Sequence, residues 1–161
     1  MVTIRDFQEQ DIRALWSIYF NTIRYINIRD YSPAQVEAWA PDNVDADLWA
    51  KRVQARHPFI AESDGVIVGY TDLQENGLVD HFFCHHKYQG CGVGRALMNH
   101  VFEQAEIRNI NRLYSEVSIT ARPFYERMGF VVIKEQQVLI RGQRLRNFVM
   151  EKSANGRFAQ V

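Results

Sequence analysis

The sequence has little cysteine and no excess of charge of either sign. Two cysteines, Cys84 and Cys91, are too few for a disulfide framework, and this is typical of chains that fold in a reducing compartment. The 161 residues include 19 lysines and arginines and 19 aspartates and glutamates, so the formal net charge is zero at pH 7. A general nucleic-acid-binding protein needs a basic face that displaces counterions. The charge balance therefore argues against nucleic acid as a partner.

Long apolar runs are also absent. No stretch approaches the ~20 apolar residues that a membrane-spanning helix needs, so no membrane partner is expected. Residues 1–6 lack the basic-then-apolar pattern of a secretory signal peptide, which leaves the cytoplasm as the expected location. A chain of this length fits one domain. We expect that domain to span residues 1–152, with residues 153–161 as a frayed tail.

The patterns that are present alternate between helix and strand. Apolar residues recur at helical spacing after Asp11, and Ser32-Pro33 is an N-cap followed by a proline at the first helical position. Asn76-Gly77 is a strong turn signal between two strand-like runs. We expect helices over 11–25, 33–40, 44–55, 92–107 and 122–128, and strands over 2–5, 59–62, 66–73, 78–84, 113–118, 130–140 and 146–151. This order predicts a mixed α/β (α+β) domain.

A glycine-rich turn, Gln89-Gly90-Cys91-Gly92-Val93-Gly94-Arg95, separates an expected strand from an expected helix. Glycine lets backbone N–H groups approach a ligand closely, and the start of the helix adds unpaired N–H groups and the positive end of its dipole. This combination suits a pyrophosphate. The turn is neither a dinucleotide fingerprint, because Arg95 stands where the last glycine is required, nor a P-loop, because no Gly-Lys-Ser/Thr follows. The alternative is a glycine turn needed only for tight packing.

A second motif lies downstream, where Ala121-x-x-Phe124-Tyr125-Glu126-x-x-Gly129-Phe130 follows an expected strand. Together with Phe82-Phe83-Cys84 and Gln89-x-x-Gly92-x-Gly94, it resembles the GNAT superfamily of N-acetyltransferases over residues 59–152. Residues 31–40, Tyr-Ser-Pro-Ala-Gln-Val-Glu-Ala-Trp-Ala, further resemble its YafP-like bacterial branch. The resemblance implies a mixed, mostly antiparallel central sheet flanked by helices, whose fourth and fifth strands splay apart.

The resemblance also implies acetyl-CoA as co-substrate, bound in the gap between those two strands, with no metal. The backbone of Phe82, Phe83 and Cys84 would bond the pantetheine and the acetyl carbonyl. The amides of the glycine-rich turn (residues 89–95) would hold the pyrophosphate, and Ser118 would lie beside the cofactor. The hydroxyl of Tyr125 would face the CoA sulfur. Many family members carry an asparagine where this sequence has Glu116, which puts that CoA contact in doubt.

Acetyl transfer to an amine needs three groups. Backbone N–H donors stabilise the charge that develops on the carbonyl oxygen, an acid protonates the leaving thiolate, and the amine loses a proton. Tyr125 is the candidate acid, against the alternative of a packed aromatic. Glu116 acting through water, Asp80 and His81 are candidate bases. Each of these three could equally be an ordinary strand residue.

Two further clusters remain. Cys84, Cys91 and nearby histidines are residue types that bind zinc. However, neighbouring residues on a strand point to opposite faces, and the spacing between the two cysteines is longer than in zinc sites. Tyr31 and Trp39 are candidates for an acceptor pocket, against a role in the core. The leading function is acetylation of a small amine or an aromatic amine; the alternatives are a peptide or protein-lysine acetyltransferase and a catalytically silent CoA sensor. A single chain and a homodimer are both compatible with the sequence.

Overall fold

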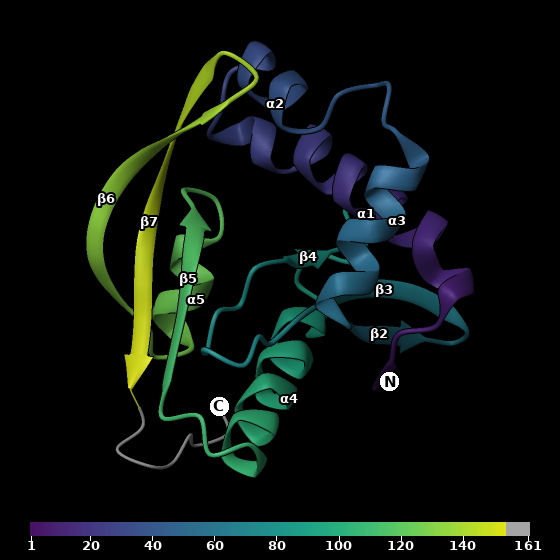
Figure 1. Cartoon of the computed structure of the whole chain (residues 1–161), viewed down its shortest axis with the longest axis vertical. Coiled ribbons are helices and arrows are strands. Elements are labelled where there is room, and N and C mark those ends of the chain that lie inside the picture. Colours follow the sequence, from purple (N-terminus) through teal and green to yellow (C-terminus); the bar gives the residue numbers. More distant parts are fainter. Residues whose placement is uncertain (154–161) are drawn as a thin grey trace.

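The structure, a computed structural model, describes residues 1–153. Its helices and strands follow the predicted order (Figure 1). The elements are β1 (Val2–Asp6), η1 (Glu9–Asp11), α1 (Ile12–Tyr25), η2 (Asn27–Arg29), α2 (Pro33–Trp39), α3 (Ala46–Arg56), β2 (Phe59–Ser63), β3 (Val66–Thr71), β4 (Phe82–Cys84), α4 (Val93–Ile107), β5 (Arg112–Ser118), α5 (Arg122–Arg127), β6 (Val131–Ile140) and β7 (Gln143–Ser153). Among the helices of this described part, none is both long and apolar enough to cross a bilayer.

The strands form two antiparallel sheets that separate between β4 and β5. One sheet has the order β1-β2-β3-β4 and the other the order β5-β7-β6. An isolated parallel bridge between Leu78 and Tyr114 joins them, and beyond it the strands diverge, as Figure 1 shows. The predicted fold class, a mostly antiparallel sheet with splayed fourth and fifth strands and flanking helices, is confirmed.

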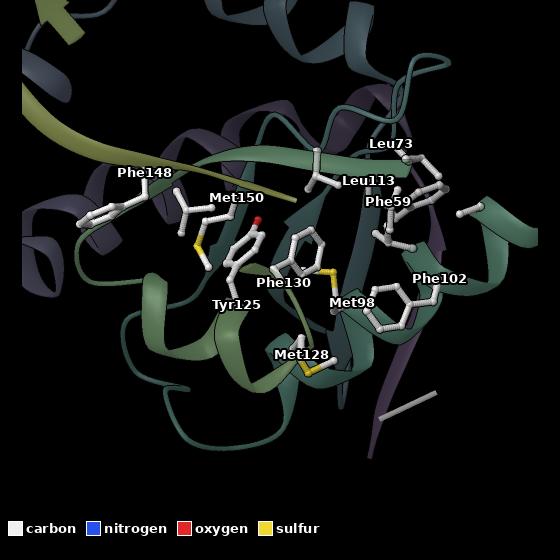
Figure 2. Close-up of a cluster of buried hydrophobic side chains, with 14 residues drawn as sticks. Phe59, Leu73, Met98, Phe102, Leu113, Tyr125, Met128, Phe130, Phe148 and Met150 are labelled. Carbon is white, nitrogen blue, oxygen red and sulfur yellow. The ribbon is translucent and has the colours of Figure 1, made fainter. Parts of the chain in front are cut away.

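A shared hydrophobic core holds the two sheets together below the gap. Phe59 from the first sheet, Met98 and Phe102 from α4, and Phe148 and Met150 from β7 all belong to it (Figure 2). Helix α4 packs on one face of the first sheet, and α1 contacts β3 and β4. The gap between β4 and β5 therefore opens above a continuous apolar floor rather than between two independent units.

The prediction of a strand from Leu78 to Cys84 is wrong for its first four residues. The buried carboxylate of Asp72 accepts hydrogen bonds from the backbone N–H groups of Asp80 and His81, both at 2.9 Å, so these amides make no ladder. Burial raises the pKa of Asp72 to about 6, against the lowering effect of the same two N–H donors. Only Phe82–Cys84 remains as strand β4, which pairs with β3.

The closing hairpin is longer than predicted. Strand β7 begins at Gln143 instead of residue 146 because its pairing with β6 extends up to the two-residue turn Arg141-Gly142. It continues to Ser153, which pairs with Arg112, so the predicted tail does not begin at Ser153. The rest of that predicted tail lies outside the described residues.

Replacing Gly77 with alanine is expected to lower the free energy of unfolding by about 2 kcal/mol or more. Gly77 has φ +91°, and a Cβ atom there would lie 2.0 Å from the carbonyl oxygen of Arg112, beside the bridge that joins the sheets. Gly65 offers a matched control, because it has φ +77° but no atom within 4 Å of its Cβ position. Thermal melting should show a smaller loss for Gly65→Ala. Equal losses would mean that backbone strain alone matters at Gly77.

Candidate active site

A cavity of about 1010 Å³ occupies the gap between β4 and β5 and extends under α1, α2 and the β6–β7 turn. Its lining brings together every residue predicted for the site except Cys91, which is exposed in the glycine-rich turn. The lining residues among those predicted are Tyr31, Trp39, Asp80, His81, Phe82, Phe83, Cys84, Gln89, Gly90, Gly92, Val93, Gly94, Arg95, Glu116, Ser118 and Tyr125.

The glycine-rich turn forms one end of this cavity and leads into α4. Gly90 and Gly92 have φ +72° and +84°, and no atom lies within 4 Å of a Cβ built at either position. Glycine is therefore used here for its backbone conformation, and the space beside it is open. The side chain of Gln89 donates to the carbonyl of Cys84 at 2.9 Å and ties the turn to β4. Because α4 begins at Val93, its unpaired first amides and dipole point at this space, an arrangement that favours anions.

The third glycine of the turn, Gly94, is required for a different reason. A Cβ on Gly94 would lie 3.0 Å from the ring of Phe124, so Gly94 allows α4 and α5 to approach each other. Its φ is not in the left-handed region. Tight packing, the alternative interpretation of the motif, thus applies to Gly94, whereas the space beside Gly90 and Gly92 remains open for a ligand.

The main chain of β4 presents alternate residues to the gap. His85 donates its N–H to the carbonyl of Val68 across the β3–β4 ladder, which fixes the alternation of paired and unpaired positions. Phe83 therefore turns its N–H and carbonyl toward β3. The main-chain groups of Phe82 and Cys84 face the gap.

One of these main-chain groups that face the gap already has hydrogen-bond partners. The carbonyl of Cys84 accepts hydrogen bonds from the Thr22 hydroxyl at 2.8 Å and from the Gln89 side chain. The main-chain groups of Phe82 and the N–H of Cys84 are the β4 positions that remain for a ligand. Burial raises the pKa of the Cys84 thiol to about 12, so this cysteine is not a thiolate nucleophile near neutral pH.

Tyr125 lies at the floor of the cavity with its side chain 2% exposed. Figure 2 shows it among the core residues around Phe130 and Met150. Its hydroxyl lies 3.4 Å from the hydroxyl of Ser115, which itself lies 2.6 Å from the Val79 carbonyl and donates to it. Ser115 is thus left to accept from Tyr125. Burial raises the pKa of Tyr125, so the phenol keeps its proton at neutral pH and can act as a proton donor.

Asp80 and His81 reach the cavity wall in different states. Asp80 forms an ion pair with Arg56, with 2.7 Å between Nε and Oδ2. His81 is 5% exposed, and its Nδ1 lies 3.1 Å from the hydroxyl of Tyr70. Burial, together with the positive charge of Arg56, holds the pKa of His81 well below its usual range, so the ring is neutral. Both side chains therefore already have partners, and neither is a free base.

Glu116 is exposed on β5 and accepts a hydrogen bond from Gln136 at 2.6 Å. It retains access to the cavity, so a water molecule could link it to a bound amine. Among the described residues, no group of three or more His, Cys, Asp or Glu side chains is placed to hold a metal ion.

The opposite end of the cavity is aromatic. Tyr31 donates its hydroxyl proton to the Arg146 carbonyl at 2.5 Å and accepts from the N–H of Ile119 at 3.0 Å, so its phenol is fixed between two chain segments. Trp39 packs edge-on against the Tyr31 ring, with centroids 5.6 Å apart, and is half-buried. Trp39 is the freer of the two side chains to contact a ligand.

Sequence reasoning missed several lining residues. Tyr19 on α1, Arg52 on α3 and Arg141 in the β6–β7 turn meet at the aromatic end, although they lie far apart in the sequence. Usable signals existed for Tyr19, which lies on the apolar stripe of α1, and for Arg52, because Trp49, three residues earlier, marks the inward face of α3.

Two polar atoms close to the cavity also lack partners. The hydroxyl of Thr120 and the side-chain carbonyl of Asn147 are buried, and neither has a hydrogen-bond partner among the described residues. Both residues line the cavity. Buried polar groups are normally satisfied, so these atoms indicate positions where a ligand or water would bond.

The comparisons with known proteins agree with this geometry. Residues 27–152 match the family model described as an acetyltransferase (GNAT) domain. An uncharacterized N-acetyltransferase, YafP, from Escherichia coli (strain K12) is 31% identical over 149 residues, which cover 92% of this chain and 94% of YafP. A crystal structure of a GCN5-related N-acetyltransferase from Rhodopseudomonas palustris has TM-score 0.89, 30% identity and coverage of 94% of both chains.

More distant structures share the fold. The putative acetyltransferase YncA from Salmonella typhimurium, solved with its cofactor acetyl-CoA, has TM-score 0.70 and 19% identity, covering 95% of this chain and 94% of its own. The family match extends over most of the described residues and includes every strand that borders the cavity from β4 onward. This chain therefore belongs to the GNAT acetyltransferase family, and its activity is acyl transfer.

Proposed function

We propose that this protein transfers an acetyl group from acetyl-CoA directly to the amine of a small molecule. The observation that carries the proposal is one continuous cavity that runs from the glycine-rich turn, past the main chain of β4 and Tyr125, to an aromatic end. Acetyl-CoA bound to the similarly folded YncA supports the choice of donor. The cofactor's pyrophosphate would lie on the amides of the glycine-rich turn, with Gly90 and Gly92 leaving room for it.

The remaining residues of the site would act on the reacting atoms. The outward N–H groups of β4 would stabilise the negative charge on the thioester carbonyl oxygen. Tyr125 would give its proton to the leaving thiolate. Glu116 would take the amine proton through water. The protonated thiol of Cys84 supports direct transfer without an acyl-cysteine intermediate.

The small-molecule acceptor is favoured over a protein lysine by the aromatic lining and the charge of this end of the cavity. Trp39 and Arg141 of the β6–β7 turn line it, and the carboxylate of Asp80 is already paired with Arg56. A protein-lysine acetyltransferase would present an open acidic cleft to its cationic substrate. A silent CoA sensor does not need a buried phenol at the cavity floor, so the presence of Tyr125 disfavours the sensor.

Release of free CoA from acetyl-CoA, measured with a thiol reagent over a broad panel of amines, tests the proposal. The panel should include arylamines, alkylamines and lysine-containing peptides. Amine-dependent release with a small amine is expected. Release with peptides alone would support the lysine acetyltransferase, and CoA binding without release for any amine would support the sensor.

The Trp39→Ala variant is expected to raise the KM for the acceptor roughly tenfold or more, because the aromatic wall is lost. The affinity for CoA should stay nearly unchanged, since Trp39 lies at the other end of the cavity. Trp39→Phe keeps an aromatic ring and should have a smaller effect. Steady-state kinetics with each substrate varied distinguishes these outcomes. An equal loss of acceptor and CoA binding would assign Trp39 to core packing.

A further inference from the structure

The acceptor end of the cavity carries positive charge that the described chain does not neutralise. Arg52, half-buried on α3, and Arg141, exposed in the β6–β7 turn, both line it. None of the ion pairs among the described residues includes either arginine. By contrast, Asp80 at the same end is paired with Arg56.

Both guanidinium groups act on the same point of the wall, the phenol of Tyr19. Tyr19 is 5% exposed, and burial raises its pKa, while the charge of Arg52, its hydrogen bond to the phenol and the charge of Arg141 oppose that rise. The Arg52 guanidinium lies 6.0 Å from the Tyr19 ring centroid and 5.6 Å from that of Trp49. Arg141 is held at the rim by its hydrogen bond to the Ala38 carbonyl at 2.7 Å.

This arrangement selects the charge of the acceptor. A lysine side chain or other ammonium group would be repelled by two arginines that have no carboxylate partner, whereas an anion would be attracted. Guanidinium groups also match the geometry of a carboxylate through paired N–H donors. An arylamine is uncharged at neutral pH, so it enters the site without this repulsion.

The rest of the wall suits a flat ring. Trp39 is half-buried beside the cavity, and the aromatic rings of Phe83 and the neutral His81 contact each other, with centroids 5.9 Å apart. Such surfaces pack against an aromatic ligand by offset or edge-on contacts.

We propose that the acceptor is an arylamine bearing a carboxylate, with the carboxylate bound by Arg52 and Arg141 and the ring packed against Trp39. This inference rests on the proposed acetyl transfer and specifies its substrate class. The amine would then point from the arginines toward the β4 strand, where the acetyl group is expected.

The test compares three acceptors of similar shape: para-aminobenzoate, para-aminobenzamide and the cationic para-aminophenyltrimethylammonium. Initial rates of CoA release should give a kcat/KM for the acid at least about tenfold above that for the amide, the usual magnitude for a hydrogen-bonded charged group. The cation should be the poorest acceptor. Equal kcat/KM values for acid and amide would overturn the inference while leaving acetyl transfer intact.

Two variants locate the effect. Arg52→Gln and Arg141→Gln should each lower kcat/KM for the acid by roughly tenfold and change that for the amide by less than about twofold. Arg52→Lys retains the charge and should keep part of the preference. Lys51→Gln is the matched control, because Lys51 is the exposed neighbour of Arg52 on α3. An unchanged preference for the acid in both glutamine variants would contradict the assignment, provided that thermal melting shows them folded.

Failure of the two proposals can be separated. Suppose that none of the three arylamines is acetylated, but calorimetry shows that CoA still binds and another amine gives CoA release. That result overturns the carboxylate inference only. Absence of CoA release with every amine of the broad panel overturns acetyl transfer itself and the inference with it.

Discussion

Gly92→Glu is expected to abolish CoA binding, with a Kd raised at least about a thousandfold. The substitution places a carboxylate in the open space in front of the first α4 amides, where the pyrophosphate would bind. The carboxylate would accept hydrogen bonds from the N–H groups that the pyrophosphate would use, and its charge would repel the incoming phosphates. Calorimetric titration of CoA into the variant measures the loss.

A control separates charge from backbone strain. Gly92→Ala shares the cost of φ +84° but adds only a methyl group to open space. Its Kd should rise far less than that of the glutamate variant, and circular dichroism should show both variants folded. If Gly92→Glu bound CoA as tightly as the native protein, the glycine-rich turn would no longer be a candidate for the pyrophosphate site.

The second large effect is expected for Tyr125→Phe, which should lower kcat roughly 10²- to 10⁴-fold, the usual contribution of a positioned acid. The variant keeps the ring and its core contacts and removes only the proton donor. Because the hydroxyl makes one long hydrogen bond, to Ser115 at 3.4 Å, the melting temperature and CoA affinity should change little. Single-turnover measurements would show whether chemistry limits the rate.

The pH dependence gives an independent check on the same residue. Acid catalysis needs the protonated phenol, and burial raises the pKa of Tyr125 above its ordinary value of 10.0. Activity that depends on Tyr125 should therefore persist from neutral pH through pH 10 and fall only above it. An alkaline fall at lower pH that disappears in the phenylalanine variant would contradict the raised pKa.

A matched variant and a substrate analogue complete the test of Tyr125. Tyr114→Phe removes a phenol whose hydroxyl accepts from Asn76 outside the cavity, and it should keep near-native kcat. The loss in Tyr125→Phe should shrink with an acyl donor whose leaving thiol has a lower pKa, because such a thiolate needs less protonation. Near-native kcat in Tyr125→Phe, with chemistry rate-limiting, would leave Tyr125 as a packed aromatic.

Local signals predicted most of the fold. Ser32 caps α2 as expected, accepting from the N–H of Gln35 at 3.1 Å, and Pro33 is the first residue of the helix. The error at Leu78–His81 arose from a contact that no local pattern records. The Asp72 carboxylate lies in a different segment, and its two hydrogen bonds replace the strand ladder there.

The site was predictable where a motif lies in one continuous segment. The glycine-rich turn and Tyr125 fall in such segments, and both line the cavity. The different purpose of Gly94 depends on its approach to Phe124 on another helix, which spacing cannot reveal. The common position of Arg52 and Arg141 at the cavity could not be predicted for a similar reason, since the two residues lie on segments far apart in the chain.

The position of β7 has a consequence for how the protein is made. β7 is the last described strand, yet it lies between β5 and β6 and pairs with both. During synthesis, β5 and β6 leave the ribosome without their shared neighbour. They remain unpaired edges until residues 143–153 emerge. The β5–β7 pairing, which spans α5 and β6 in the chain, forms more slowly than the local β6–β7 hairpin, and unpaired edges favour association with other chains. The second wall of the cavity is thus assembled only after nearly all of the described chain has been synthesised.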